Sequence, residues 1–361
     1  MAIYWIIYLI PLIAFLLPVR LTPEMQRISL MLFGVLLIIV IGLRHEVGGD
    51  WDRYLIVYDY LENKSFFEAI KFKDIGYEFI HWFSYKYFNG IYTTNFISAT
   101  IFVTGLIYFC RLTPAVWLSL CISIPIMVIV VSMGYTRQAL ALSFFMLALI
   151  SLTKQKFFNF YLLIFIGILF HKTLLIMIPV GILYKLNRHR MLLPLVSPNI
   201  VFSTISIVVV VVVVVIYVLT IWHEVEHMIF YYVEIKFHHS SGGLIRVMFG
   251  GLSALLFFIY RKEFEKIYHD VKIWNVLAYI SIFLVPTAVF YSTLADRVAL
   301  YLIPLQLIVI SRVFVLIKSV YYRTLFGIAS VTIYAGAMFI WFIFGKHSNL
   351  WLPYNNVLLI Q

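Results

Sequence analysis

Residues 157–184 read FFNFYLLIFIGILFHKTLLIMIPVGILY, an apolar stretch that one polar pair, His171-Lys172, interrupts at its centre. The stretch forms either one long helix or two short helices that meet at His171. One long helix would turn every later loop to the other membrane face and place the basic clusters around Arg188 and Arg261 outside. Because cytoplasmic loops carry the excess of Lys and Arg in membrane proteins, the sequence predicts two short helices with a turn at His171.

The composition excludes an ordinary soluble protein. Hydrophobic residues make up 63% of the 361 positions and charged residues only 12%, too few to cover a globular surface. The net charge of +11 is dispersed through short loops, which favours positive-inside topology and argues against a nucleic-acid partner. The first apolar stretch, residues 2–17, lacks a basic leader and a cleavage site, so we expect a retained helix. With the N-terminus outside, most basic residues fall in cytoplasmic loops, and this orientation is therefore expected.

The apolar runs predict an all-α, polytopic membrane helix bundle that forms a single transmembrane domain over residues 1–361. About twelve crossings are expected, at residues 2–19, 28–43, 96–110, 115–132, 138–153, 157–170, 173–184, 200–222, 244–260, 274–292, 298–311 and 324–345.

Two outer loops are expected to carry most of the acidic residues and histidines. The longer one, residues 44–95, is rich in acids and aromatics, and its stretches Tyr54–Leu61 and Tyr77–Phe88 resemble helices that lie at the interface. The second, residues 223–243, is rich in His and Tyr.

Four polar positions, Arg44, Arg137, His171 and Arg297, share an unusual depth. Each lies 14 to 17 residues from a basic residue that marks the opposite membrane face; these markers are Arg27, Lys154, Lys185 and Arg312, respectively. In a helix that distance is about 21–26 Å, which is shorter than the roughly 30 Å of hydrocarbon. Charges at such a depth are costly and normally face a water-filled cavity with a function.

The first of these positions begins a polar cluster, Arg44-His45-Glu46-Val47-Gly48-Gly49-Asp50-Trp51-Asp52. The paired glycines allow backbone conformations that aim side chains back at the membrane. Asp50 and Asp52 have the D-x-D spacing that holds a divalent cation in many glycosyltransferases. The pattern is weak by itself, so we expect no cofactor and keep a cation here only as an alternative.

The second cluster, Gly134-Tyr135-Thr136-Arg137-Gln138, is predicted to open a helix. An arginine there opposes the helix macrodipole and requires a compensating anion. A guanidinium beside free backbone N–H groups is suited to phosphate. The alternative is an interfacial arginine that reaches the lipid headgroups.

The third and fourth clusters are Phe170-His171-Lys172 and Ala295-Asp296-Arg297. His171 is a candidate proton acceptor or phosphate donor, although a lone histidine is often structural. Asp296 is expected to be a helix N-cap, and Arg297 either pairs with it or binds a substrate anion.

The segment His223-Glu224-Val225-Glu226-His227 matches H-E-x-x-H, the zinc protease signature. A third ligand at a known spacing is missing, since the metzincin position falls on Val233. Glycan contacts, or an interfacial loop without chemistry, fit the segment better.

Taken together, these clusters resemble the EpsG-type, Wzy-like polysaccharide polymerases of bacteria. The resemblance rests on Arg44 with Gly49-Asp50, on Arg137-Gln138-Ala139-Leu140-Ala141 and on Phe170-His171. It covers residues 40–185 well and extends more loosely to the C-terminal helices; the H-E-x-x-H match is not part of it. It implies a GT-C-like fold in the inner membrane, with the active site open to the periplasm.

The resemblance further implies that a growing glycan moves from undecaprenyl pyrophosphate onto the next lipid-linked repeat unit. Donor, acceptor and membrane lipids are then the expected partners, with a chain-length regulator protein as a further candidate. Arginines would bind the pyrophosphates, and the candidates are Arg137, Arg44 and Arg297, with Lys172 beside them. His171 is the first candidate for the base, and Asp50 and Glu46 follow it. Sugar-stacking candidates are Trp51, Tyr54, Tyr58, Tyr135, Tyr231 and Tyr232, although interfacial aromatics are commonly anchors.

Three other functions are kept as alternatives. An O-antigen ligase or another lipid-linked glycan transferase would share the arginines and the histidine. A flippase for the same lipid-linked sugar would require inverted repeats and polar groups at mid-membrane, and neither is found. A membrane zinc metalloprotease would rest on residues 223–227.

Overall fold

The computed structural model of the protein describes residues 1–17, 21–61, 64–69, 74–88, 90–189 and 242–359, with the single residues 212, 219, 226 and 230. The predicted crossing at 200–222 and the second outer loop, with Tyr231, Tyr232 and the H-E-x-x-H segment, therefore lie outside the described residues or almost entirely so. Within the described part, the chain divides into two compact units.

The protein is a multi-pass, all-α membrane protein. Six described helices are long and apolar enough to cross a membrane: α2 (Pro23–Gly42), α6 (Ile91–Cys110), α8 (Thr136–Thr153), α15 (Val271–Phe290), α16 (Ser292–Leu316) and α17 (Val320–Phe344). A bent pair, α13 (Gly243–Ile259) and α14 (Arg261–Ile267), would add a seventh span. Shorter apolar helices are α1 (Ala2–Leu16), α9 (Phe157–Phe170) and residues 116–132. The helical bundle is thus confirmed, whereas twelve crossings and a GT-C-like arrangement stay predictions.

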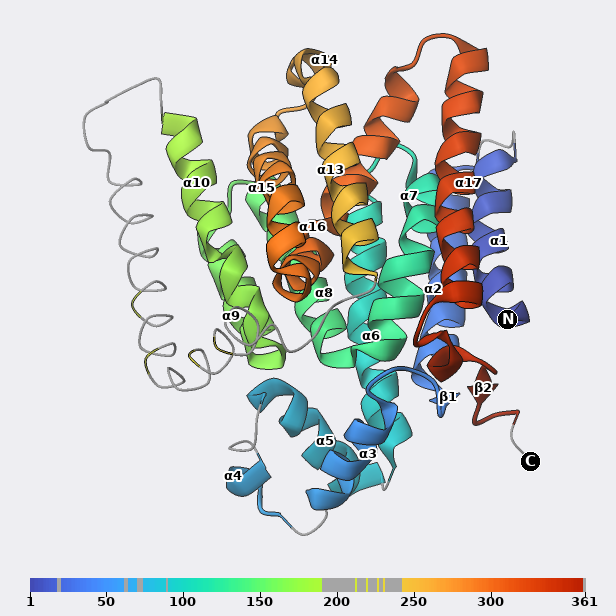
Figure 1. Ribbon diagram of the computed structural model, residues 1–361, viewed down its shortest axis with the longest axis vertical. Helices are drawn as coiled ribbons and strands as arrows, with labels where there is room; N and C mark the ends of the chain where they lie inside the picture. The colour runs from blue at the N-terminus through green and yellow to red at the C-terminus, as the bar shows by residue number, and fades with distance from the viewer. Residues whose placement is uncertain are drawn as a thin grey trace. The chain divides into compact units, whose positions relative to one another are not determined.

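The first unit comprises residues 1–144, 169–172 and 310–361. Helix α2 begins where Thr22 caps it, its hydroxyl accepting the Met25 N–H at 3.2 Å, and Pro23 supplies the first helical residue. Helix α7 (Val116–Ser123) continues as a π-helix, η1 (Ile124–Ser132), from the turn that holds Pro125. Helices α1, α2, α6, α7 and α17 run side by side in this unit (Figure 1).

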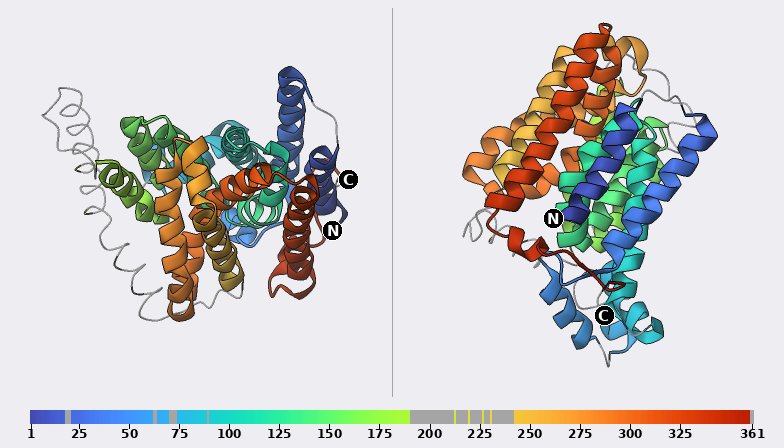
Figure 2. Two further views of the ribbon diagram at one scale, coloured as in Figure 1. Left: turned by 90° about the horizontal axis from the view of Figure 1, so that it is seen from above. Right: turned by 90° about the vertical axis from the view of Figure 1, so that its right-hand side faces the viewer.

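The loop that the sequence predicts to be the longer outer one forms short helices in its described residues, and two of them match the predicted helical stretches. It contains α3 (Trp51–Tyr60), α4 (Phe66–Ala69) and α5 (Ile75–Phe88), which lie together at one end of α2 and α6 (Figure 1). The N-terminus lies near the same end (Figure 2). There β1 (Arg44–His45) pairs antiparallel with β2 (Asn355–Asn356), and a 3-10 turn, η4 (Ser348–Trp351), precedes β2.

The second unit comprises residues 145–168 and 173–309. The two short helices predicted for residues 157–184 are confirmed. Helix α9 ends at Phe170, a 3-10 helix, η2 (Lys172–Met177), follows His171, and α10 (Ile178–His189) runs back along α9. The ring of Phe157 stacks on Tyr184 with centroids 5.7 Å apart, and a Cβ on Gly181 would lie 2.6 Å from the Phe160 ring. The two segments therefore form an antiparallel hairpin.

In the same unit α15 packs against both α13 and α10. The expected N-cap role of Asp296 is wrong, because α16 begins at Ser292, a full turn earlier. Asp296 instead accepts hydrogen bonds from Arg246 at the start of α13, from Nη2 at 2.6 Å and from Nε at 2.5 Å. This bidentate pair links the first turn of α13 to the N-terminal part of α16.

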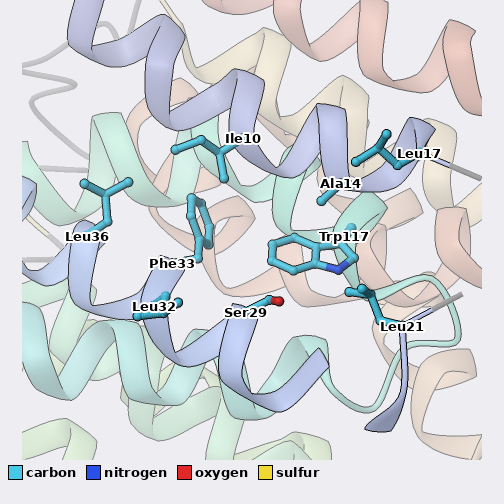
Figure 3. Close-up of a pocket in the computed structure, with 9 residues that line it drawn as sticks. All are labelled: Ile10, Ala14, Leu17, Leu21, Ser29, Leu32, Phe33, Leu36 and Trp117. Carbon is cyan, nitrogen blue, oxygen red and sulfur yellow. The ribbon is translucent and has the colours of Figure 1, made fainter. Parts of the chain in front are cut away.

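A cavity of about 440 Å³ lies between α1 and α2, and the Trp117 side chain of α7 also lines it (Figure 3). Its other lining residues are Ile10, Ala14, Leu17, Leu21, Ser29, Leu32, Phe33 and Leu36. The Ser29 hydroxyl bonds its own helix at the Met25 carbonyl. The lining is mostly apolar and carries no charged side chain.

Candidate functional site

Arg44 lies just beyond the end of α2, and its side chain is only 1% exposed. It donates four hydrogen bonds, to the Ile41 and Val47 carbonyls, to Asn95 Oδ1 and to Thr136 Oγ1, at 2.6–3.2 Å. A buried charge is tolerated when it is hydrogen-bonded in this way. Arg44 thereby ties the end of α2 to α6 and to the first residue of α8.

The first two sequence clusters meet in space through their backbones. Gly48 takes φ +117°, a conformation that L side chains rarely adopt, and its missing Cβ leaves room for the Met133 carbonyl. The Asp50 N–H donates to the Gly134 carbonyl at 3.2 Å. The glycine loop after Arg44 is therefore docked on the turn that opens α8.

Arg137 extends from the first turn of α8 to an acidic partner in the outer loop. Its Nη1 donates to Asp74 Oδ2 at 2.6 Å, with the two side chains 11% and 4% exposed. Its guanidinium carbon lies 5.9 Å from the centroid of the Tyr54 ring, and the Tyr54 hydroxyl is 3.4 Å from Asp50 Oδ2. The predicted compensating anion of Arg137 is thus a carboxylate of the protein.

A small polar cavity of about 120 Å³ opens beside this ion pair. It is lined by Arg53, Tyr54, Val57, Tyr77, Glu78, His81 and Arg137. The lining comes from α3, α5 and α8, so the outer-loop helices and the arginine of the second cluster build it together. Its size suits a phosphoryl group or a few polar atoms of a ligand.

Two residues at this cavity have perturbed acid–base properties. Burial, together with the charge of Arg137, lowers the pKa of His81 to about 3, so its imidazole is neutral and a weak base near pH 7. Its Nδ1 lies 3.7 Å from Glu78 Oε2. Burial, then the Asp50 carboxylate, raises the pKa of Tyr54 to about 12. The Tyr54 hydroxyl therefore keeps its proton and can donate it in a hydrogen bond.

The third cluster also reaches the outer-loop helices of the first unit. The Phe170 ring stacks on Phe144 with centroids 5.4 Å apart, and a Cβ on Gly76 would lie 3.1 Å from the Phe170 ring. Asp74, which pairs with Arg137, lies two residues before Gly76. The start of α5 therefore contacts both the Arg137 cluster and the residue that precedes His171.

The other predicted residues occupy varied positions. Glu46 and Asp52 are exposed, Asp50, Tyr135 and His171 are half-buried, and Lys172, Trp51, Tyr54 and Tyr58 are buried. Of these aromatics, Tyr54 lines the polar cavity. Arg297 belongs to the second unit. Both carboxylate oxygens of Asp296, which precedes Arg297, accept hydrogen bonds from Arg246.

Across the described residues, no group of three or more His, Cys, Asp or Glu side chains is arranged to hold a metal ion. In the D-x-D pair, Asp50 is half-buried, with Oδ2 3.4 Å from the Tyr54 hydroxyl, and Asp52 is exposed.

Sequence reasoning missed Asp74, which directly precedes α5, and Tyr77, Glu78 and His81 of α5 as members of the site. A signal was present, because positions 74, 77, 78 and 81 follow the i, i+3, i+4, i+7 spacing of one helix face. These residues are polar or aromatic, and the face they form packs against the second cluster.

Comparison with known families decides the assignment. The model of the EpsG family matches residues 27–356, nearly the whole chain.

The chain belongs to the EpsG family.

No curated protein and no solved structure matches the chain. Membership in the EpsG family implies a membrane function of the polysaccharide-polymerase type. The match also includes the clusters at Arg44 and Arg137, which meet in the first unit, and the cluster at His171, whose Phe170 contacts the start of α5.

Proposed function

We propose that this protein is a polysaccharide polymerase of the bacterial inner membrane. It transfers a growing O-antigen-like or capsule-like glycan from undecaprenyl pyrophosphate onto the next lipid-linked repeat unit. The reaction takes place at the periplasmic face, the side on which the sequence predicts residues 44–95 to lie. The fold is proposed to be GT-C-like, and the reaction needs no metal or other cofactor.

The observation that carries this proposal is the position of Arg137. A guanidinium has five N–H groups, so the pair with Asp74 leaves donors for an oxygen-rich anion. It lies beside a polar cavity, on a helix that the sequence predicts to begin below the outer membrane surface. A pyrophosphate whose lipid tail remains in the membrane would lie at about that depth.

In the proposed reaction, the acceptor hydroxyl attacks C1 of the donor sugar. The C1–O bond breaks, its electron pair stays on the pyrophosphate oxygen, and the hydroxyl proton moves to His171. Arg137 stabilises the charge that develops on the leaving pyrophosphate, an effect that is stronger in a low-dielectric cavity than in water. His81 is a poor candidate for the base, because its pKa of about 3 makes it too weak a proton acceptor.

The other predicted residues keep supporting roles in this proposal. Arg44 uses four hydrogen bonds within the protein, so we assign it to holding Thr136, and hence Arg137, in place. Arg297 and Lys172 are proposed to bind the pyrophosphates of donor and acceptor. Asp50 and Glu46 are proposed as the alternative bases.

Reconstitution with lipid-linked repeat units tests the reaction. Purified protein in proteoliposomes is expected to lengthen the lipid-linked glycan into a ladder of repeats, with or without a chelator. A ladder that disappears with chelator would contradict the metal-free mechanism. Transfer of a preformed chain onto a lipid A core without lengthening would identify a ligase, and movement across the bilayer without new linkages would identify a flippase.

His171→Ala is expected to lower the rate of transfer about 10²–10⁴-fold, the usual contribution of a general base, while lipid-linked substrate still binds. Single-turnover rates and substrate binding, measured on the same preparation, separate the two effects. Wild-type synthesis by His171→Ala would move the base role to Asp50. His347→Ala, at an exposed histidine of the same unit, is the matched control.

A further inference from the structure

The C-terminal segment after α17 is built into the site, although it is distant from it in the sequence. Its strand β2 pairs with β1, so that Asn356 lies opposite Arg44. The Gly48 N–H donates to the Leu350 carbonyl at 2.8 Å, and the Val357 N–H donates to the Leu43 carbonyl at 2.9 Å. The segment is therefore hydrogen-bonded to both sides of the first cluster.

Trp351 is the central residue of this segment and is only 1% exposed. Its Nε1–H donates to the Ile129 carbonyl in the π-helix at 2.9 Å. The Tyr4 hydroxyl donates to the Trp351 carbonyl at 2.7 Å. Both the ring and the backbone of Trp351 are thus fixed by hydrogen bonds, which leaves the side chain a single orientation.

The Trp351 ring contacts the two backbones that carry the candidate polar groups. A Cβ on Gly134 would lie 2.2 Å from Trp351 Cζ2, and a Cβ on Gly49 would lie 3.3 Å from Trp351 Cη2. Gly134 is three residues before Arg137, and Gly49 directly precedes Asp50. One aromatic side chain therefore sets the spacing between the glycine loop and the turn that opens α8.

We propose that Trp351 is a positioning residue that holds the Arg137 guanidinium and the Asp50 carboxylate at their working separation. This role rests on the proposed function of Arg137. Trp351 does not touch the polar cavity, whose lining residues come from α3, α5 and α8. It acts through packing, and a displacement of about 1 Å at a reacting group can cost about 100-fold in rate.

A double-mutant cycle between Gly134 and Trp351 tests the proposal. Gly134→Ala inserts a methyl group where the indole ring lies, and Trp351→Phe removes the part of the ring that this methyl group would meet. We expect Gly134→Ala to lower the rate of glycan transfer at least about tenfold, and Trp351→Phe to lower it several-fold. The transfer rate of the double variant is expected to be about tenfold or more higher than the rate that the two single losses, multiplied together, would give. Such non-additivity is typical of residues in direct contact.

The measurements are single-turnover transfer of lipid-linked repeat units, substrate KM and thermal unfolding of the full-length protein in detergent. A positioning role lowers the transfer rate more than it changes KM or the unfolding temperature. Gly336→Ala is the matched control, because nothing lies within 4 Å of its added Cβ. It is expected to behave like the wild type.

The outcomes separate the two proposals. Wild-type protein that makes no polymer would overturn the proposed function, and the positioning role with it. Polymer synthesis by the wild type, with single effects that simply multiply in the double variant, would overturn the positioning role alone. A loss of transfer that merely follows the loss of folded protein in every variant would also overturn it.

Discussion

Arg137→Ala is expected to abolish long polymer and to leave a single repeat unit on the lipid or on the acceptor core. Removing one preorganised donor to a developing negative charge usually lowers the rate about 10²–10³-fold. Arg137 lines the polar cavity from α8, and the other guanidinium of the lining, Arg53, comes from α3. The measurement is glycan chain length in cells, followed by transfer rates in proteoliposomes.

Loss of folding is the main confounding effect of this substitution. Without Arg137, the Asp74 carboxylate, which is 4% exposed, loses the positive charge that pairs with it. Removing one member of a buried ion pair typically costs about 3–5 kcal/mol. The double variant Arg137→Ala/Asp74→Asn removes the buried charge as well, so it is expected to regain stability but not activity.

Arg137→Lys and Arg111→Ala complete the set of variants. Lysine keeps the positive charge but not the planar fork of donors, so it is expected to retain partial activity. Arg111, an exposed residue after α6, is the control and is expected to tolerate alanine. Wild-type chain lengths in the stable double variant would refute the role of Arg137 in catalysis.

The local topology of this protein could be predicted from the sequence, because hydropathy and charge are local signals. The break at His171 can be predicted because one continuous helix would turn the later basic loops outward. Helices α9 and α10 form the hairpin that this break requires. The interfacial helix expected at Tyr77–Phe88 is α5, which begins two residues earlier.

The partners of the predicted polar residues could not be derived in the same way. Asp74 is one of several acids in the outer loop and lies 63 residues from Arg137, so no spacing singles it out. Trp351 resembles an ordinary interfacial anchor in sequence. Its contacts with Gly49 and Gly134 depend on the packing of segments more than 200 residues apart.

Arg44 shows a further limit of sequence reasoning. Depth and charge alone predict a polar environment for it, and both a substrate phosphate and protein carbonyls satisfy that prediction. The structure provides four protein acceptors. A sequence gives the need for a hydrogen-bond partner but not the identity of that partner.

The two glycines of the first cluster are expected to differ strongly in how alanine at each position affects the stability of the protein. Gly48→Ala is expected to remove most of the folded protein, whereas Gly49→Ala is expected to be tolerated. Gly48 takes φ +117°, and an added Cβ would lie 2.0 Å from the Met133 carbonyl oxygen and 2.9 Å from its carbon. These are backbone atoms, which cannot rotate away as a side chain can.

The cost of Gly48→Ala has two parts. A strained backbone conformation costs about 1–3 kcal/mol, and overpacking a buried contact typically costs a further 1–3 kcal/mol or so. Their sum is a large part of the roughly 5–15 kcal/mol that stabilises an ordinary protein domain. The alternative to unfolding is separation of the glycine loop from Met133, which would also break the Asp50–Gly134 hydrogen bond.

At Gly49 the nearest atom to an added Cβ is Trp351 Cη2, at 3.3 Å. A shift of a few tenths of an ångström in the indole ring relieves that contact, so Gly49→Ala should lower the unfolding temperature only slightly. The measurement is the yield of monodisperse protein in detergent and its unfolding temperature, with Gly336→Ala as the neutral reference. If Gly48→Ala were as stable as Gly49→Ala, the glycine loop could not be docked on Met133, and the first two clusters would not be held together by their backbones.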